Sequence, residues 1–273
     1  MSGVGTQNAA AISQAFDSIA ECYDDIFTQT LVGRAQRNAV WDSLTQVFSP
    51  ADRVLELNCG TGEDGLFLAR RGTSVIACDA SPAMIAVARR RRSREASQAR
   101  IQFQVLRNEN ILEMEAEAPF DGAFSNFSGL NCVADIQAVA LSLGKLVRPG
   151  GRVLICLSSR FCAWETLWFL ARMNVRKAFR RVSGRTIASV NGVSIPVWYP
   201  SVRLLRKVFS DWFRLRSFRA VGLFVPPSYV EPFVRRHDGL ISLFANLDRA
   251  LAGLPFLRCL GDHVLLDFER IQR

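Results

Sequence analysis

A glycine-rich turn between two apolar runs holds the residues of this sequence that are best suited to bind a ligand. The first run, 54–57, leads into Cys59-Gly60-Thr61-Gly62, and the second, 75–78, leads into Asp79. Glycines permit a positive φ and let a ligand touch the backbone, and the helix expected after the turn points unpaired N–H groups at the same place. Ligands of parallel α/β sheets lie outside the carboxyl ends of the strands, so the glycines and Asp79 are expected to meet there. A carboxylate in that place can accept hydrogen bonds from both hydroxyls of a ribose.

Two nucleotide-binding folds fit this stretch. Gly60, Gly62 and Gly65 satisfy G-x-G-x-x-G, and Asp79 stands at about the spacing of the ribose-binding acid, which predicts a nicotinamide oxidoreductase. Glu56 favours another interpretation, because a carboxylate buried in the first strand is costly unless a partner or ligand compensates it. In a dinucleotide-binding fold that position is usually apolar.

The string ELNCGTGEDGLFLA resembles the first motif of the class I S-adenosylmethionine-dependent methyltransferases. The resemblance implies that Glu56 helps to order the turn around the methionyl part of the cofactor and that Asp79 binds the ribose. Pro149-Gly150-Gly151, placed before the fifth apolar run, is a second signal of this family, and the similarity covers about 16–159. It implies cofactor contacts from Tyr23, Glu56, Asn58, Cys59, Gly60, Gly62, Asp79, Ala80, Met84, Asn108, Glu109 and Asn126.

Several of these roles have a plainer alternative. AFDSIAECYDDIF resembles the N-terminal segment of small-molecule methyltransferases, in which an aromatic residue near Tyr23 closes over the cofactor, but Tyr23 also ends an apolar stripe. Met84 would lie beside the adenine, or it packs in the core. Asn108 stands where the family often has an acid that binds the adenine amino group. Asn126 is not followed by the two prolines of the Asn-Pro-Pro-aromatic motif, which is found in enzymes that methylate the amino groups of bases or glutamine. Asn is also common in turns, which is the plainer explanation for this residue.

Composition sets further bounds. The chain has 273 residues, 49% of them hydrophobic, which is enough for one large domain with a substantial core. It has no run of about 20 apolar residues and no basic leader, so we predict neither a transmembrane helix nor a signal peptide, and we expect a cytoplasmic protein. Seven cysteines without a C-x-x-C pair and only two histidines predict reduced core thiols and no metal site.

The net charge of +9 is concentrated between Arg160 and Arg219, a segment that contains thirteen Lys and Arg residues and only two acidic residues. Within this segment, 161–181 predicts an amphipathic basic helix with Trp164 and Trp168 on its apolar side. A lid over a hydrophobic acceptor, a helix lying on anionic lipid and ordinary packing with a solvated face all fit this pattern. Its position beside the ligand crevice favours the lid. The separate run of arginines at 89–94 is interpreted as the solvated C-terminal end of a helix.

Residues 187–199 alternate around Asn191-Gly192 and predict a β-hairpin, which together with the basic helix would form a cap. We expect an α/β fold, a Rossmann-like seven-stranded sheet that is mostly parallel with an antiparallel last strand, with helices on both faces and a cap insertion after the fifth strand. The predicted single domain over 1–273 consists of N-terminal helices at 1–50, a cofactor-binding core at 51–160, the basic cap at 161–200, and the C-terminal part of the sheet with a helical insert at 201–273.

The predicted activity is methyl transfer from S-adenosyl-L-methionine to a small, hydrophobic or lipid-like acceptor. Such a transfer mainly needs alignment and exclusion of water, although an oxygen acceptor of high pKa would need a base. His237, His263 and Tyr199 are weak candidates, and a surface or structural role explains both histidines as well.

Two other function classes stay open: an NAD(P)-dependent oxidoreductase, and a non-catalytic cofactor-binding module associated with a membrane or protein partner. The missing Asn-Pro-Pro motif argues against nucleic acid as a substrate. Peripheral membrane contact through the basic cap is compatible with the main prediction. The sequence fixes neither the acceptor nor the oligomeric state.

Overall fold

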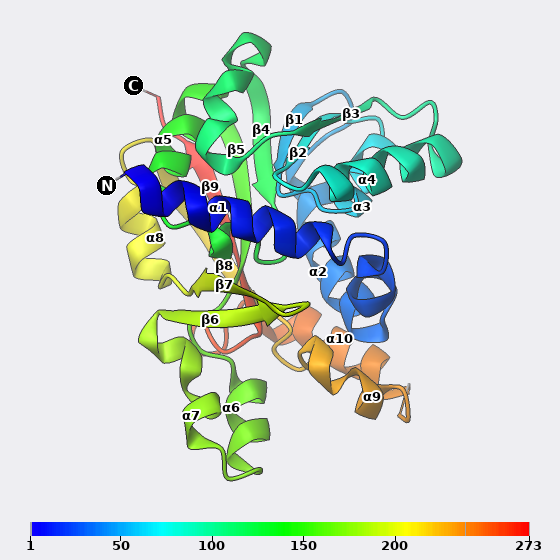
Figure 1. Ribbon diagram of the computed structural model, residues 1–273, viewed down its shortest axis with the longest axis vertical. Coiled ribbons are helices and arrows are strands. Elements are labelled where there is room, and N and C mark those ends of the chain that lie inside the picture. Colours follow the sequence, from blue (N-terminus) through cyan, green and yellow to red (C-terminus); the bar gives the residue numbers. More distant parts are fainter. Residues whose placement is uncertain (1, 238, 273) are drawn as a thin grey trace.

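The computed structural model describes residues 2–237 and 239–272. Its centre is a seven-stranded sheet in the order β3-β2-β1-β4-β5-β9-β8, with helices on both faces (Figure 1). Strands β1 to β5 pair in parallel, and β9 runs antiparallel between β5 and β8, so the predicted fold class is confirmed. The strands of this sheet are β1 Arg53–Leu57, β2 Ser74–Asp79, β3 Ile101–Val105, β4 Phe120–Ser125, β5 Val147–Ser158, β8 Phe213–Val221 and β9 His263–Arg270.

Helices connect and cover the strands. Side chains cap several of their first turns: the hydroxyl of Thr30 accepts from the N–H of Gly33, and the hydroxyl of Ser81 accepts from that of Met84. The helical segments are α1 Ser2–Asp17, η1 Asp24–Thr28, α2 Leu31–Val47, α3 Glu63–Ala69, α4 Pro82–Glu95, η2 Asn108–Glu117, η3 Gly129–Cys132, α5 Ile136–Leu146, α6 Ala163–Leu170, α7 Val175–Ala178, η4 Arg180–Ser183, α8 Val202–Phe209, η5 Ser228–Val230, α9 Glu231–Val234 and α10 Gly239–Leu251. No helix within the described ranges has the length and apolar character needed to cross a bilayer.

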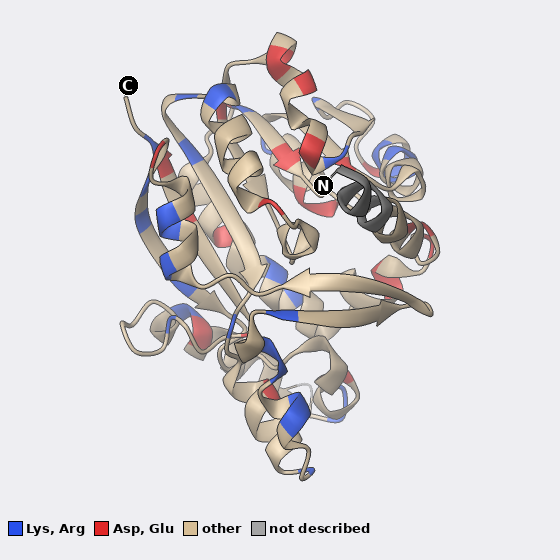
Figure 2. Cartoon of the chain, turned by 60° about the vertical axis from the view of Figure 1, so that its left-hand side comes forward, with Lys and Arg blue, Asp and Glu red and all other residues tan. Residues whose placement is uncertain are grey.

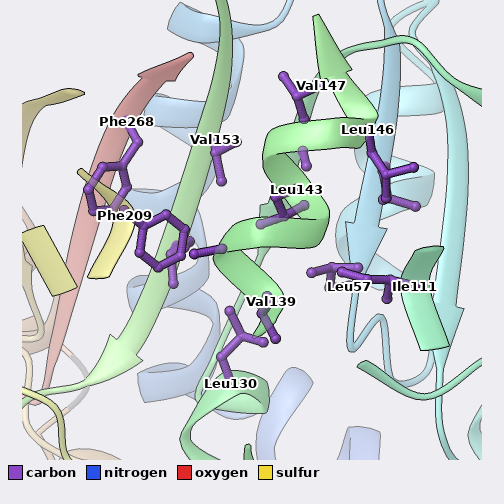
Figure 3. Packing of buried hydrophobic residues seen from close by; sticks show 14 of the residues in the cluster. Leu57, Ile111, Leu130, Val139, Leu143, Leu146, Val147, Val153, Phe209 and Phe268 are labelled. Atoms are coloured by element: carbon purple, nitrogen blue, oxygen red, sulfur yellow. The ribbon is translucent and has the colours of Figure 1, made fainter. Parts of the chain in front are cut away.

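The sheet is buried on both faces, which explains why its central strands are almost continuously apolar. On one face, Leu55 and Leu57 of β1 join α5 and α8 in a single core, in which the rings of Phe209 and Phe268 stack at 4.7 Å (Figure 3). On the other face, Val54 joins α2, α3 and α4 in a second core. These two cores hold the strand ends in fixed positions.

The strand order reverses between β1 and β4, because β2 and β3 extend the sheet on one side of β1 and β4 extends it on the other. In open α/β sheets this reversal leaves a crevice at the carboxyl ends of the strands. The loops after β1, β2 and β4 meet there, and these loops carry the predicted cofactor residues.

The predicted hairpin is present as β6 Arg185–Val190 and β7 Val193–Trp198, an antiparallel pair. Its turn residues have left-handed backbone angles, with φ of 47° at Asn191 and 81° at Gly192. These angles suit a two-residue hairpin turn, for which Asn-Gly is the preferred sequence. In Figure 1 the hairpin lies below α1, and α1 packs against β7.

The predicted continuous helix over 161–181 is wrong. The chain leaves the helical path after α6, because Met173 adopts φ of 57° and Asn174 caps a new short helix by accepting from the N–H of Lys177. The predicted apolar stripe is divided as well: Trp164 donates to the carbonyl of Phe224, whereas Leu167 is exposed. Local periodicity predicted a helical segment but not this break.

Candidate functional site: one cavity with a polar and an apolar end

A cavity of about 270 Å³ opens at the carboxyl ends of β1, β2 and β4. Loops of the sheet, α1, α2 and the β6–β7 hairpin enclose it. Ten of the twelve predicted cofactor residues line it, and their role as cofactor contacts stays a prediction. These ten are Tyr23, Asn58, Cys59, Gly60, Asp79, Ala80, Met84, Asn108, Glu109 and Asn126.

Asp79 fixes the glycine turn to the start of α4. Its Oδ2 accepts from the N–H of Gly60 at 2.9 Å, and its Oδ1 accepts from that of Ser81 at 2.8 Å. Burial raises the pKa of Asp79, and these backbone donors oppose the rise. Each carboxylate oxygen retains acceptor capacity on the cavity side, which suits the two hydroxyls of a ribose.

Gly62 lies outside the cavity and has a packing role. It is the N-cap of α3 and has a left-handed φ of 79°, and a Cβ at this position would lie 2.7 Å from the ring of Phe103. A side chain would therefore clash with the ring while holding a strained backbone angle.

Glu56 also lies outside the cavity, beneath the turn. It is 1% exposed, the backbone of Gly65 hydrogen-bonds its carboxyl group, and its Oε2 has no hydrogen-bond partner among the described residues. Burial raises the pKa of Glu56 well above its ordinary value, and the nearby carboxylate of Asp64 raises it further. Glu56 thus supports the start of α3 from below.

A buried ion pair that the sequence analysis missed lies at the polar end of the cavity. Arg37 of α2 donates from Nη1 to Oδ2 of Asp64 at 2.5 Å, and both residues are 5% exposed. Asp64 also accepts from Trp41 at 2.6 Å and from Asn126 at 3.0 Å. The guanidinium lies 4.9 Å from the ring centre of Phe127. The arrangement keeps a positive charge in the cavity wall.

Arg37 has donor capacity left over. Its Nε is buried without a hydrogen-bond partner among the described residues, and the residue lines the cavity. A sequence signal existed: Arg37 lies on the buried stripe of α2 with Val40 and Leu44, where a charge is costly unless it is paired. Its partner, 27 residues away, could not be read from the sequence.

The N-terminal segment is fastened over the polar end. Ser13 donates to the carbonyl of Ala80 at 2.9 Å, and Asp17 accepts from the N–H of Ala83 at 3.1 Å. Asp24 accepts from Thr61 at 2.8 Å and pairs with Arg91. These contacts hold the segment that carries Tyr23, a cavity residue whose burial raises its pKa to about 12.

Arg91 corrects the interpretation of the arginine run at 89–94 as wholly solvated. It is 6% exposed and bonds Glu63 at 2.6 Å in addition to Asp24. The run therefore includes a structural cation, which links α4 to the N-terminal segment and to α3.

The part of the cavity that the hairpin lines is apolar, and we call it the apolar end. Side chains alternate along β6, so that Ala188 and Val190 line the cavity while Ile187 and Ser189 face out. From β7, Ile195 and Val197 line the same end. The hairpin half of the predicted cap lines the cavity, whereas no residue of α6 or α7 does, so the lid interpretation of the basic helix gains no support; the role of the hairpin as a cap stays a prediction.

The three candidate catalytic side chains lie outside the cavity lining. His263 is buried behind Phe127, with its ring 5.5 Å from the Phe127 ring, and burial lowers the pKa of His263. The hydroxyl of Tyr199 faces Thr186 at 3.5 Å. His237 is exposed beside Phe233. Across the described ranges, no group of three or more His, Cys, Asp and Glu side chains is arranged to hold a metal ion.

Comparison with known proteins agrees with this geometry. Residues 54–151 match the family model of a methyltransferase domain. The chain is 33% identical over 147 residues to a demethylmenaquinone methyltransferase of Clavibacter sepedonicus, a match that covers 53% of this chain and 57% of that protein. Residues 54–151 therefore match a methyltransferase domain, and the fold is that of S-adenosylmethionine-dependent methyltransferases. The matches do not support the nicotinamide interpretation of the glycine turn.

A second relative is the 2-phytyl-1,4-naphtoquinone methyltransferase of Synechococcus elongatus, 33% identical over 151 residues that cover 53% of this chain and 62% of that protein. This chain therefore spans about three fifths of the length of these two relatives. A solved structure titled as a putative S-adenosylmethionine dependent methyltransferase from Listeria monocytogenes has the same fold. It has a TM-score of 0.59 and 13% identity, and the match covers 86% of this chain and all of that chain.

The burial of Glu56 gives a testable pH dependence. Because the folded-state pKa lies above the unfolded value, the native protein holds a proton that the unfolded chain releases, so Glu56 makes the native state less stable as pH rises above about 4.5. Between about pH 5 and about pH 8, the free energy of unfolding of Glu56→Gln should rise relative to wild type, by at most about 1.4 kcal/mol per pH unit. Urea unfolding at a series of pH values measures this difference.

Glu115→Gln, which removes an exposed carboxylate from η2, is the control. A pH-independent difference for Glu56→Gln would contradict the assigned direction of the shift.

Proposed function

We propose that this protein transfers a methyl group from S-adenosylmethionine to a small, hydrophobic or lipid-like acceptor. The observation that carries the proposal is the division of a single cavity. Its polar end contains the glycine turn, Asp79 and Arg37, and its apolar end contains the hairpin side chains Val190 and Ile195. A polar, charged cofactor and an apolar acceptor would thus meet inside one enclosed space.

The residues at the polar end fit the cofactor. Asp79 offers carboxylate oxygens for the ribose, and Met84 and Ala80 offer an apolar surface for the adenine beside it. Arg37 is a cation that lines the cavity, so it suits the carboxylate of the methionyl group. Asn108, which begins η2 and lines the cavity, would bind the adenine amino group through its side-chain oxygen.

The chemistry requires alignment more than a base. S-adenosylmethionine supplies an electrophilic methyl group on a sulfonium. The hairpin and Phe127 would exclude water and hold the acceptor in line with that methyl group. Tyr23, whose pKa is raised to about 12, stays protonated near neutral pH and serves as a hydrogen-bond donor rather than a base.

The acceptor class rests on the apolar end and on the names of two relatives. Those proteins are named for demethylmenaquinone and 2-phytyl-1,4-naphtoquinone as acceptors. The family-model match ends at residue 151, before the hairpin, so the hairpin side chains are the part of this cavity that would set acceptor choice. A lipid quinol of this kind is the first acceptor to test. Peripheral contact with a membrane is part of the proposal, since such an acceptor resides in one.

Calorimetry tests the cofactor assignment. S-adenosylmethionine and S-adenosylhomocysteine should bind, and NADH should not; transfer of labelled methyl groups to a quinol dispersed in detergent then tests the activity. Binding of NADH alone would overturn the methyltransferase proposal in favour of an oxidoreductase. Cofactor binding without transfer to any lipid extract would favour a non-catalytic module.

The role of Arg37 has a test with an internal control. Arg37→Lys keeps a cation beside Asp64 but loses the planar donor pair, so S-adenosylmethionine should bind about tenfold to a hundredfold more weakly. Methylthioadenosine lacks the carboxylate, and its affinity should be unchanged. Arg34→Lys, on the exposed side of the same helix, should leave both affinities as in wild type. An equal loss for both ligands would contradict the assignment.

If the hairpin forms the wall of the acceptor site, a substitution on its inner face should weaken binding of the acceptor without changing the affinity for the cofactor. Val190→Asp places a charge at the apolar end, so the KM for a hydrophobic acceptor should rise about tenfold while the Kd for S-adenosylhomocysteine stays the same. Ser189→Asp, on the outward face of the same strand, is the matched control. Steady-state kinetics and calorimetry give the two numbers, and equal acceptor kinetics for both variants would argue against the hairpin as the acceptor wall.

A further inference from the structure

Apolar side chains are exposed over one region, formed by α6, α7, η4 and the outer face of β6. We call this region the docking face. Met173, at the turn between α6 and α7, is 89% exposed, and Leu167 is 66% exposed. A group of exposed apolar side chains on neighbouring elements is a candidate interaction site. The apolar members of the docking face are Leu167, Met173, Val175, Phe179, Val182 and Ile187.

The same region is strongly cationic, as the blue segments around α6 and α7 at the bottom of Figure 2 show. Residues 160–185 contain seven Lys and Arg side chains and one acid, Glu165. Glu165 is 1% exposed and is already bound by Arg180 and Arg181 at 2.8–2.9 Å. The described contacts of the other five cations include no carboxylate; these are Arg160, Arg172, Arg176, Lys177 and Arg185.

We propose that the docking face binds the surface of a bilayer that carries anionic lipids. Arg176 and Lys177 would pair with the headgroups, while Met173 and Val175 would enter the boundary of the acyl chains. A nucleic acid would neutralise the cations but leave the apolar side chains in water. The mixture of exposed apolar and unneutralised cationic side chains therefore selects a membrane.

The conformation of Met173 supports this choice. An unbranched apolar side chain stands at the tip of the turn with φ of 57°, where glycine or asparagine would cost less and Met gains no packing. Behind the tip, Trp168 lies against Tyr229 and under the guanidinium of Arg172, which is 3.5 Å from the Trp168 ring. Amphipathic rings flanked by cations suit the headgroup level of a membrane.

The docking face and the apolar end of the cavity share one strand. The chain passes from η4 directly into β6, whose Ile187 faces out and whose neighbours Ala188 and Val190 line the cavity. Docking would hold the hairpin at the membrane, so that a lipid-like acceptor could reach the cavity along it. This use of the face rests on the proposed function, whereas binding to the bilayer does not.

Vesicle flotation tests the proposal with the full chain. The wild type should float with vesicles of phosphatidylcholine mixed with phosphatidylglycerol, and far less with phosphatidylcholine alone. Met173→Asp combined with Val175→Asp, and Arg176→Glu combined with Lys177→Glu, should each lower binding to the anionic vesicles about tenfold or more. Both pairs of positions lie on the surface, so binding of S-adenosylhomocysteine should be unchanged and reports that each variant is folded.

Matched controls lie on other parts of the molecule. Leu141→Asp adds a charge at an exposed apolar position of α5, and Arg94→Glu combined with Lys145→Glu changes the net charge as much as the Arg176, Lys177 pair does. Both controls should bind vesicles as the wild type does.

Equal flotation of wild type and docking-face variants would overturn the proposal, as would absence of vesicle binding. A further contradicting result is a wild type that binds single-stranded RNA but not vesicles, and that loses the RNA binding in the Arg176→Glu, Lys177→Glu variant. That result would show that the ligand of the docking face is a nucleic acid and not a bilayer. Vesicle binding without cofactor binding would contradict the proposed function but would still support membrane binding by the docking face.

Discussion

A carboxylate can remain buried only where donors surround it, and Asp64 draws its donors from elements that are distant in sequence. Arg37 and Trp41 reach it from α2, and Asn126 reaches it from the end of β4. Loss of either partner in such a buried pair typically costs about 3–5 kcal/mol, because the remaining charge is left uncompensated. The pair therefore fixes the start of α3, the position of α2 over the sheet and a cation in the cavity wall at the same time.

This constraint explains how the two ends of the cavity differ. At the polar end, specific hydrogen bonds hold neighbouring elements together: the N–H of Gly60 donates to Asp79, and the hydroxyl of Thr61 donates to Asp24. At the apolar end, the hairpin contributes small and branched side chains. The matched family region of 54–151 contains the glycine turn and Asp79, but neither Arg37 nor the hairpin. A fold of this kind serves many reactions, so the acceptor must be argued from the hairpin side chains.

Features that depend on local sequence could be predicted, and features that depend on distant pairing could not. The strands, the glycine turn and the Asn191-Gly192 hairpin follow from short patterns, and the structure contains all of them. The buried Arg37 lies on a stripe visible in the sequence, but its partner depends on the tertiary fold. The break at Met173 could not be predicted, because the apolar spacing of the sequence there is that of a regular helix. The backbone path is set instead by the left-handed conformation of Met173 and by the side chain of Asn174, which caps the next helix.

A crystal structure with S-adenosylhomocysteine and a short-chain naphthoquinol would test the central claim most directly, namely that one cavity holds a charged cofactor at one end and an apolar acceptor at the other. The account predicts the ribose hydroxyls on Asp79, the methionyl carboxylate on Arg37, and the quinol ring between Phe127 and the inner face of the hairpin. A cofactor bound with its carboxylate away from Arg37, or a quinol bound outside the hairpin, would contradict it.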